Sequence, residues 1–129
     1  MKTKNIFLWT LLNVCVVVAS FTFVAKKQMR HVVVFKFIPT ATATQIAEVT
    51  NAFAGLKNKI PGIVAFEHGI NVSPEKKDLG FHHVYMLTFE NTEARDKYLP
   101  HPEHKKFGDL LGKLKVVEDV FVVDYVSGE

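Results

Sequence analysis

Two kinds of hydrophobic pattern divide the chain after residue 30. Short segments rich in β-branched and aromatic residues, bounded by polar residues or turn formers, are typical of β-strands. Longer segments in which apolar residues recur every three or four positions are typical of amphipathic helices. The first pattern predicts four strands, over residues 31–38, 63–72, 81–90 and 116–126.

The first helix is predicted between the first two strands. Thr42 and Gln45 form a capping-box pattern, in which the two side chains satisfy each other's backbone N–H groups. Pro61 and Gly62 stop the helix before the second strand. Its apolar residues follow one another at alternating spacings of three and four, and they are Ile46, Val49, Phe53, Leu56 and Ile60. They form one stripe that a sheet can bury.

A second helical region, between the third and fourth strands, is interrupted by two prolines. Asn91 or Thr92 caps a short helix, and Pro100 ends it. Pro102 suits the first position of a further helix, where proline is favoured. The apolar stripe of that further helix consists of Phe107, Leu110, Leu111 and Leu114.

The order of these elements is βαββαβ, with the second helix broken. This order predicts an α+β, ferredoxin-like fold, in which helices cover one face of a four-stranded antiparallel sheet. The first strand is apolar on both faces, however, because Val33 and Phe35 alternate with Val32 and Val34. An uncovered apolar face usually marks an interface, and a second copy related by a two-fold axis is the simplest cover. We therefore expect a homodimer through the sheet face, a dimeric α+β barrel with a small cavity between the two sheets.

Residues 6–25 form an uncharged, mostly apolar run that is long enough to cross a bilayer as a helix. The run is either a cleaved secretory signal, with a small-residue cleavage site at residues 18–20, or an uncleaved membrane anchor. Both alternatives predict an exported protein, which is periplasmic or secreted in the first and held to the membrane by residues 6–25 in the second. We place the signal or anchor at residues 1–27 and the folded domain at residues 28–129.

Composition excludes several classes of site and partner. Cys15, the only cysteine, lies in the apolar run, so the domain is predicted to have no disulfide, cysteine-ligated zinc or cysteine nucleophile. Lys2 and Lys4 contribute two of the 16 basic residues behind the net charge of +3, which leaves 14 against 13 acidic residues. A nearly neutral domain lacks the electrostatic footprint of nucleic-acid binding, so we expect no nucleic-acid partner.

Candidate catalytic side chains are predicted on buried faces. Tyr98 shares a helix face with Ala94, and His104 shares one with Phe107, so we expect both side chains to turn inward. Asp124, in the last strand, supplies a carboxylate. A tyrosine hydroxyl, an imidazole and a carboxylate can together act as general acid and base near neutral pH. We therefore select Tyr98, His104 and Asp124 as catalytic candidates.

A ligand pocket is expected where inward-facing strand residues meet these groups, in the cavity between the two sheets. Alternate residues of a strand share a face, which groups side chains of the first and third strands. The predicted pocket residues are His31, Val33, Phe35, His83, Tyr85 and His101. We expect His68 and His82 at the surface or in turns.

Metal binding is the competing use of these histidines. His101 and His104 are three positions apart, but His101 precedes Pro102, which disfavours helical geometry at residue 101. No carboxylate of suitable spacing completes a three-ligand site. The sequence also lacks a phosphate loop and a dinucleotide fingerprint. We therefore predict neither a metal nor a cofactor.

Five segments of the chain together resemble the stress-responsive A/B barrel, or Dabb, family. They read "HVVVFKF", "PGIVAFEHGINVSPE", "GFHHVYMLTFE", "YLPHPEHKKFGDLL" and "VVDYV" in this order, within residues 31–127. The Tyr-x-x-His-Pro-x-His element from Tyr98 to His104 is the most specific of these. The resemblance implies a ferredoxin-like protomer and a homodimer built through the sheets.

The resemblance also implies roles for individual residues. The family includes plant stress proteins and a plant polyketide cyclase that performs aldol condensation and ring closure. Tyr98 and His104 match the catalytic pair of that cyclase. His31 and His83 match its strand histidines, and Asp124 matches the aspartate of its final Asp-Tyr. By this resemblance His104 abstracts a proton next to a carbonyl, Tyr98 donates to the enolate oxygen, and Asp124 holds an imidazole in place.

Three functions are compatible with the sequence. The first is a homodimeric module that binds a small hydrophobic or carbonyl ligand without turnover. The second is a cyclase-like or lyase-like acid/base enzyme that uses Tyr98 and His104. The third is monooxygenase-type chemistry in the barrel. Since the histidine element marks the whole family and not only its cyclase, the sequence favours the first function.

Overall fold

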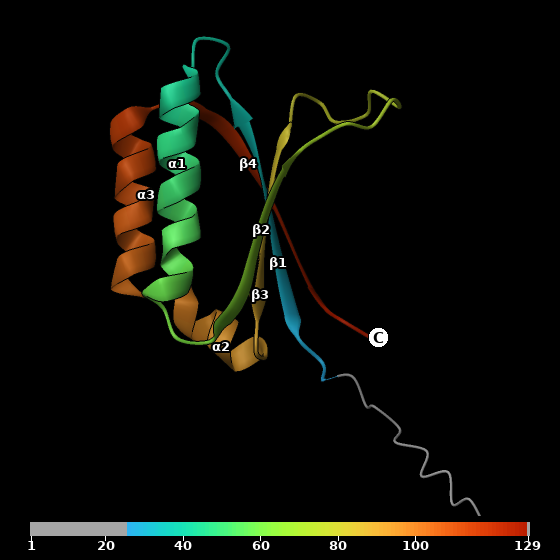
Figure 1. Ribbon diagram of the computed structural model, residues 1–129, viewed down its shortest axis with the longest axis vertical. Coiled ribbons are helices and arrows are strands. Elements are labelled where there is room, and N and C mark those ends of the chain that lie inside the picture. The colour runs from blue at the N-terminus through green and yellow to red at the C-terminus, as the bar shows by residue number, and fades with distance from the viewer. Residues whose placement is uncertain (1–25, 129) are drawn as a thin grey trace, which may run out of the picture.

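The computed structural model describes residues 26–128, which form one sheet and a layer of helices (Figure 1). In chain order the elements are β1 (Met29–Phe37), α1 (Ala43–Gly55), the 3-10 helix η1 (Leu56–Asn58), β2 (Ile63–Ile70), β3 (His83–Phe89), α2 (Thr92–Tyr98), α3 (Pro102–Leu114) and β4 (Val117–Val126). The apolar run 6–25 lies outside the described residues, so the signal or anchor expected there stays a prediction. Within residues 26–128, no helix combines the length and the apolar character that crossing a membrane requires.

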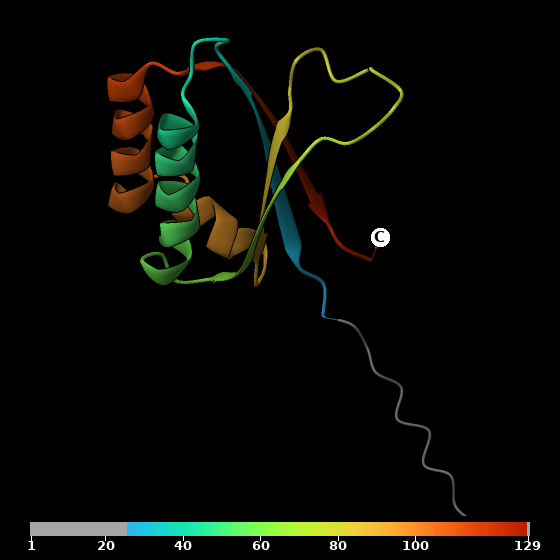
Figure 2. The same ribbon diagram turned by 45° about the horizontal axis from the view of Figure 1, so that its top comes forward.

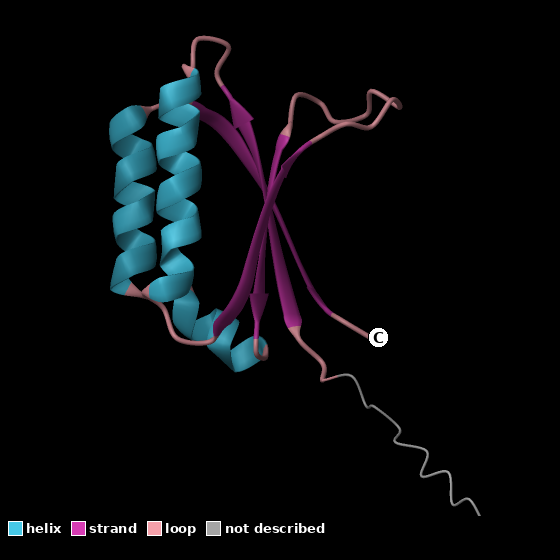
Figure 3. Ribbon diagram, viewed as in Figure 1, coloured by secondary structure: helices cyan, strands magenta, loops and turns pink. Residues whose placement is uncertain are grey.

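The four strands form one antiparallel sheet in the order β2-β3-β1-β4. Helices α1 and α3 lie side by side over one face of the sheet, and α2 lies near one end of it (Figure 3). The opposite face has no helix over it, as the turned view also shows (Figure 2). This arrangement confirms the predicted ferredoxin-like α+β fold.

The helix ends follow the predicted capping signals. The Thr42 hydroxyl accepts a hydrogen bond from the Gln45 N–H at 3.2 Å, and the Gln45 side chain accepts one from the Thr42 N–H at 2.9 Å. Asn91 caps α2 by accepting from the backbone N–H of Ala94 at 2.9 Å. Helix α3 begins at Pro102. Local sequence signals therefore determine where the chain breaks between α2 and α3. This break positions Tyr98 and His104, which lie on either side of it.

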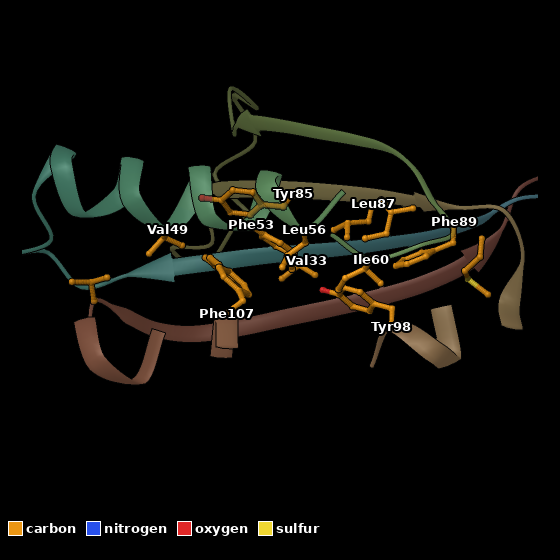
Figure 4. Close-up of a cluster of buried hydrophobic side chains, with 14 residues drawn as sticks. Val33, Val49, Phe53, Leu56, Ile60, Tyr85, Leu87, Phe89, Tyr98 and Phe107 are labelled. Carbon is orange, nitrogen blue, oxygen red and sulfur yellow. The ribbon is translucent and has the colours of Figure 1, made fainter. Parts of the chain in front are cut away.

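Aromatic side chains fill the space between the sheet and the helices (Figure 4). Phe53 of α1 stacks on Phe107 of α3, with ring centroids 4.6 Å apart. The Phe53 ring also lies 5.2 Å from that of Tyr85 and 6.0 Å from that of Phe35. Buried aromatic rings contribute large apolar areas, so this cluster is the main attachment of the helix layer to the sheet.

The face of the sheet opposite the helices has an apolar centre, with charged residues such as Arg30, Lys36 and Glu67 around it. In β1 the residues Met29, His31, Val33 and Phe35 are buried under the helices, whereas the residues between them are partly exposed. The strand register extends this alternation to β3 and β4. We define the outer face by Val32, Val34, Val84, Met86, Phe121 and Val123. Its apolar character agrees with the expectation that one sheet surface needs a cover.

Candidate functional site

A cavity of about 260 Å³ lies between the helix-facing side of the sheet and α3. Three polar side chains line it, and they come from three elements: His31 from β1, Tyr98 from α2 and His104 from α3. The apolar part of the wall includes Val33, Phe35, Phe53, Phe107, Leu111 and Val122. A cavity of this kind suits a small molecule with an apolar body and one polar end.

This position corrects the location expected from the sequence. The cavity is formed by one protomer and opens to its surface beside Leu99, Val120 and Val122, which are 47%, 44% and 48% exposed, whereas we expected a pocket between the sheets of two copies. Both faces of β1 are apolar, and the face with His31, Val33 and Phe35 turns toward the helices. The strand residues therefore meet Tyr98 and His104 beneath the helix layer.

Tyr98, the last residue of α2, is fully buried (Figure 4). Within the described residues its hydroxyl has no hydrogen-bond partner, although the side chain lines the cavity. Burial raises the pKa of Tyr98, so the hydroxyl keeps its proton and can donate. Leaving a buried hydroxyl unpaired costs free energy, which a ligand that accepts this hydrogen bond would recover.

His104 lies in the first turn of α3, directly beside Tyr98. The two rings stack with their centroids 4.2 Å apart. The Nδ1 atom of His104 lies 2.9 Å from the carbonyl oxygen of Leu99. Since a carbonyl only accepts hydrogen bonds, Nδ1 carries a hydrogen, and in the neutral ring Nε2 then holds the lone pair. His104 can therefore accept a hydrogen bond, or a proton, through Nε2.

His31 reaches the cavity from the sheet, and a hydrogen bond to Asp124 holds its ring on the side away from the cavity. It lies opposite Asp124 in the β1–β4 register, and its Nδ1 is 2.6 Å from Oδ1 of Asp124. The second oxygen of that carboxylate pairs with the guanidinium of Arg95 in α2. The His31 and Tyr98 rings meet edge to face at 5.6 Å. A chain of three groups, Arg95, Asp124 and His31, thus ends at the cavity wall.

His31 is uncharged near neutral pH. Burial first, and then the positive charges of His104 and Arg95, lower its pKa from 6.5 to about 4. The Asp124 carboxylate alone would favour the protonated ring, but Arg95 shares that carboxylate and opposes its effect. The hydrogen of the neutral ring then lies on Nδ1, facing Asp124.

Acidification is expected to destabilise the protein through His31. Its pKa is lower in the folded state than in the unfolded state, so the unfolded chain takes up a proton first as the pH falls. The stabilisation is fully present above pH 6.5 and is lost as the pH falls toward 4, by about 3 kcal/mol in total. Urea unfolding at a series of pH values between these limits measures this loss.

Two variants separate His31 from the other titrating groups. His31→Gln should lose less of its free energy of unfolding than the wild type over the same range. His82→Gln should keep the wild-type dependence, because His82 is exposed. Parallel pH profiles for His31→Gln and the wild type would contradict the assignment.

The structure places two predicted pocket residues, His83 and Tyr85, outside the cavity lining. The Tyr85 hydroxyl pairs with that of Thr50 in α1 at 2.9 Å, which ties α1 to β3. The His83 ring packs edge-on against Phe37 at 4.8 Å. Phe53 packs against Tyr85 and itself lines the cavity, so its ring separates this region from the cavity.

His101 also lies outside the lining of this cavity. Its backbone is extended before Pro102, and its Nδ1 accepts a hydrogen bond from the N–H of Glu103 at 3.1 Å. The ring therefore caps the N-terminus of α3. His68, which we expected in a turn or at the surface, is exposed but lies within β2, where its ring stacks on that of Tyr85 at 4.8 Å.

The groups gathered at the cavity are those of acid/base chemistry. Within residues 26–128, no cluster of three or more His, Cys, Asp or Glu side chains is arranged to hold a metal ion. His101 and His104, the pair with ligand-like spacing, each use Nδ1 for a backbone contact. A histidine with a free lone pair, a buried tyrosine hydroxyl and a histidine–carboxylate pair remain to act on a ligand.

The sequence pattern did not single out Arg95 or Phe53 as site residues. Arg95 precedes Tyr98 by three positions and therefore shares its helix face, which is the only local signal of its place. Phe53 belongs to the predicted apolar stripe of α1, where nothing distinguishes a cavity-lining residue from other core residues. The contact between Arg95 and Asp124 joins residues of α2 and β4 that are far apart in the sequence, so only the structure shows it.

Comparison with known proteins places the fold and the site in a family. The model of the Stress responsive A/B Barrel Domain family matches residues 29–127. The stress-response A/B barrel domain-containing protein HS1 of Arabidopsis thaliana is 35% identical over 102 residues, which are 78% of this chain and 91% of that protein. Olivetolic acid cyclase of Cannabis sativa is 31% identical over 97 residues, which are 75% of this chain and 94% of that protein.

Solved structures show the same architecture. A dimeric ferredoxin-like protein of unknown function from Jannaschia sp. CCS1 superposes with a TM-score of 0.64 at 27% identity, covering 76% of this chain and 97% of the other. The family match, the two relatives and this likeness agree with the resemblance stated from the sequence. The chain belongs to the stress-responsive A/B barrel domain family.

Proposed function

We propose that the protein is a homodimer in which each protomer binds a small, largely apolar molecule with a carbonyl or similar acceptor at Tyr98. The observation that supports this most directly is the fully buried Tyr98 side chain, which lines a cavity and whose hydroxyl has no partner among the described residues. Buried polar groups are usually hydrogen-bonded, so an unpaired hydroxyl on a cavity-lining side chain is a natural partner for an acceptor of a ligand. The apolar wall supplies the burial that a ligand body requires.

The dimer in this proposal rests on the outer face. Phe121 and Val123 are 53% and 40% exposed there, beside the aliphatic side chains of Val32 and Val34. The Jannaschia structure with the same fold is described as dimeric. Two sheets in face-to-face contact would bury both outer faces and leave each cavity within its own protomer.

The test is binding of a small aromatic ketone, acetophenone, followed by NMR shifts of the cavity residues. Tyr98→Phe keeps the ring and removes only the hydroxyl. We expect its affinity for acetophenone to fall about tenfold, the value of one buried neutral hydrogen bond.

The matched control is Tyr125→Phe, which removes a hydroxyl from the outer-face side of β4, away from the cavity lining. Its affinity for acetophenone should equal that of the wild type. Equal affinities for Tyr98→Phe and the wild type, or shifts confined to residues away from the cavity, would contradict the proposal.

A second candidate function is acid/base catalysis on a carbonyl compound in the same cavity. It is favoured by the tautomer of His104, whose Nδ1–H donates to Leu99 and whose Nε2 is free to act as a base. The stacked Tyr98 is placed to donate to an oxygen of the same ligand. A relative with 31% identity is named a cyclase, which is consistent with this chemistry.

The steps balance without a cofactor. Nε2 of His104 takes a proton from the carbon next to the carbonyl, and the C–H electron pair forms an enolate whose oxygen Tyr98 stabilises. The enolate carbon then attacks a second carbonyl carbon of the same molecule, which forms the C–C bond. The resulting alkoxide takes the proton back from His104. The imidazole thus returns to its starting form.

A further inference from the structure

Arg95 lies behind the polar end of the cavity, outside its lining, and is connected to His31 through Asp124. It is only partly exposed, and its guanidinium contacts two carboxylates, Oδ2 of Asp124 and Oδ1 of Asp96, the latter at 2.9 Å. Asp96 is exposed on the same helix, whereas Asp124 belongs to β4. Arg95 thus links α2 to the strand residue that holds His31.

The charged and titratable groups that face His31 come from three neighbouring elements. Asp124 approaches from β4, Arg95 and Tyr98 approach from α2, and His104 approaches from α3. On β3, its neighbours Leu87 and Phe89 are apolar. The charge state of His31 is therefore set by one anion, one permanent cation and one second histidine.

We propose that Arg95 is a positioning residue that fixes and neutralises the Asp124 carboxylate, so that His31 stays uncharged and the cavity selects an uncharged ligand. The inference rests on the proposed function of this cavity and adds the charge class of the ligand. It is independent of whether the ligand is turned over.

The physical reason is the pairing of opposite charges. A guanidinium stays protonated at every physiological pH, so Arg95 and Asp124 form a pair of zero net charge. Asp124 then accepts the Nδ1 hydrogen of His31 without needing a second positive charge. Without Arg95, the carboxylate would act on His31 alone and would favour the imidazolium form, as an unshared anion does. That form would turn the Nε2 atom of His31 into a donor and would place a positive charge at the cavity wall, with the compensating charge of Asp124 behind it.

The first experiment follows the ring nitrogens of His31 by NMR in the ligand-free protein as the pH is lowered. In the wild type His31 should stay neutral to about pH 5, with its hydrogen on Nδ1. Arg95→Met keeps the aliphatic bulk and removes the charge, so the titration of His31 should move upward by about one pH unit or more. Lys97→Met removes one charge from the same helix at an exposed position and should leave the titration unchanged.

Arg95→Lys serves as the second variant, because it keeps the charge and loses the forked geometry. It should leave His31 closer to the wild type than Arg95→Met does. If Arg95→Met fails to fold, Arg95→Gln takes its place in the same titration. An unchanged His31 titration in a folded variant without charge at residue 95 overturns the proposal.

The second experiment compares two ligands of similar size, neutral acetophenone and anionic benzoate, at pH 5. The wild type should prefer acetophenone, and Arg95→Met should shift the ratio of affinities toward benzoate by about tenfold. If Arg95→Met shifts the titration of His31 to higher pH but leaves the ratio of the two affinities unchanged, the claim about ligand charge is overturned. If neither molecule binds the wild type, the proposed function fails, while the titration still decides the role of Arg95.

Discussion

Replacing Phe121 and Val123 together with glutamate is expected to convert a dimeric protein into a monomer. Both side chains lie on the outer face of β4 and are 53% and 40% exposed in the protomer. In a dimer through this face, four carboxylates would be brought into the interface, more than Arg30 and Lys36 of each protomer are placed to pair, since the positions directly opposite in β1 are Val32 and Val34. Each unpaired buried charge costs several kcal/mol, which exceeds what an interface of standard size can compensate. Analytical ultracentrifugation over a wide concentration range measures the loss.

The matched control uses the same strand and the opposite side. Val120 is 44% exposed, but it lines the cavity on the helix-facing side. Val120→Glu should therefore remain a dimer, although ligand binding should weaken. Circular dichroism shows whether both variants are folded. A wild type that sediments as a monomer at millimolar concentration would contradict the dimer, and an equal effect of Val120→Glu would contradict the choice of face.

The fold was predictable because each element has a local signal. Thr42 with Gln45, Asn91 and Pro102 mark helix starts through backbone groups that lie within three residues of them. The strands are marked by runs of β-branched and aromatic residues. An order of βαββαβ with short connections leaves few ways to arrange one sheet and one helix layer, so topology follows from order.

The side of the sheet that the helices cover was not predictable. In β1, Val32 and Val34 are as apolar as Val33 and Phe35. The alternation of residues therefore does not show which face of the strand the helices cover. Burial under α1 and α3 resolves the choice only in three dimensions. This is why we expected the cavity between two sheets, whereas it lies beneath the helices.

The candidate site was predictable only where its geometry is local. Tyr98 and His104 are six residues apart on either side of a proline break, and helix periodicity alone turned both inward. The role of His101 was missed because a histidine that caps a helix and one that lines a pocket look alike in the sequence. The pairing of His31 with Asp124 spans most of the domain and depends on strand register. The resemblance to the family indicated Asp124 as a site residue. The contact of Arg95 with Asp124 is known only from the structure.

Replacing His104 is expected to abolish any proton abstraction in the cavity. The measurement is exchange of the methyl protons of acetophenone for deuterium in D2O, followed by NMR. His104→Asn places an amide N–H near the position of Nδ1, so the contact with the Leu99 carbonyl can persist while the base is lost. If His104 is the base, the exchange rate should fall by about 10²- to 10⁴-fold, the usual contribution of a general base.

The control for adventitious exchange by imidazole is His82→Asn. His82 is exposed and lies near Asp78, away from the cavity lining, so its loss should leave the rate unchanged. Tyr98→Phe should slow exchange as well, because the enolate oxygen loses its donor, and the loss in rate should exceed the tenfold loss in affinity. That excess distinguishes stabilisation of the enolate from simple binding.

If wild-type exchange matches that of buffer while acetophenone still binds, the cavity is a binding site and the catalytic candidate is contradicted. If exchange is fast but insensitive to His104→Asn, a different base acts, and the pairing of Tyr98 with His104 does not explain the chemistry.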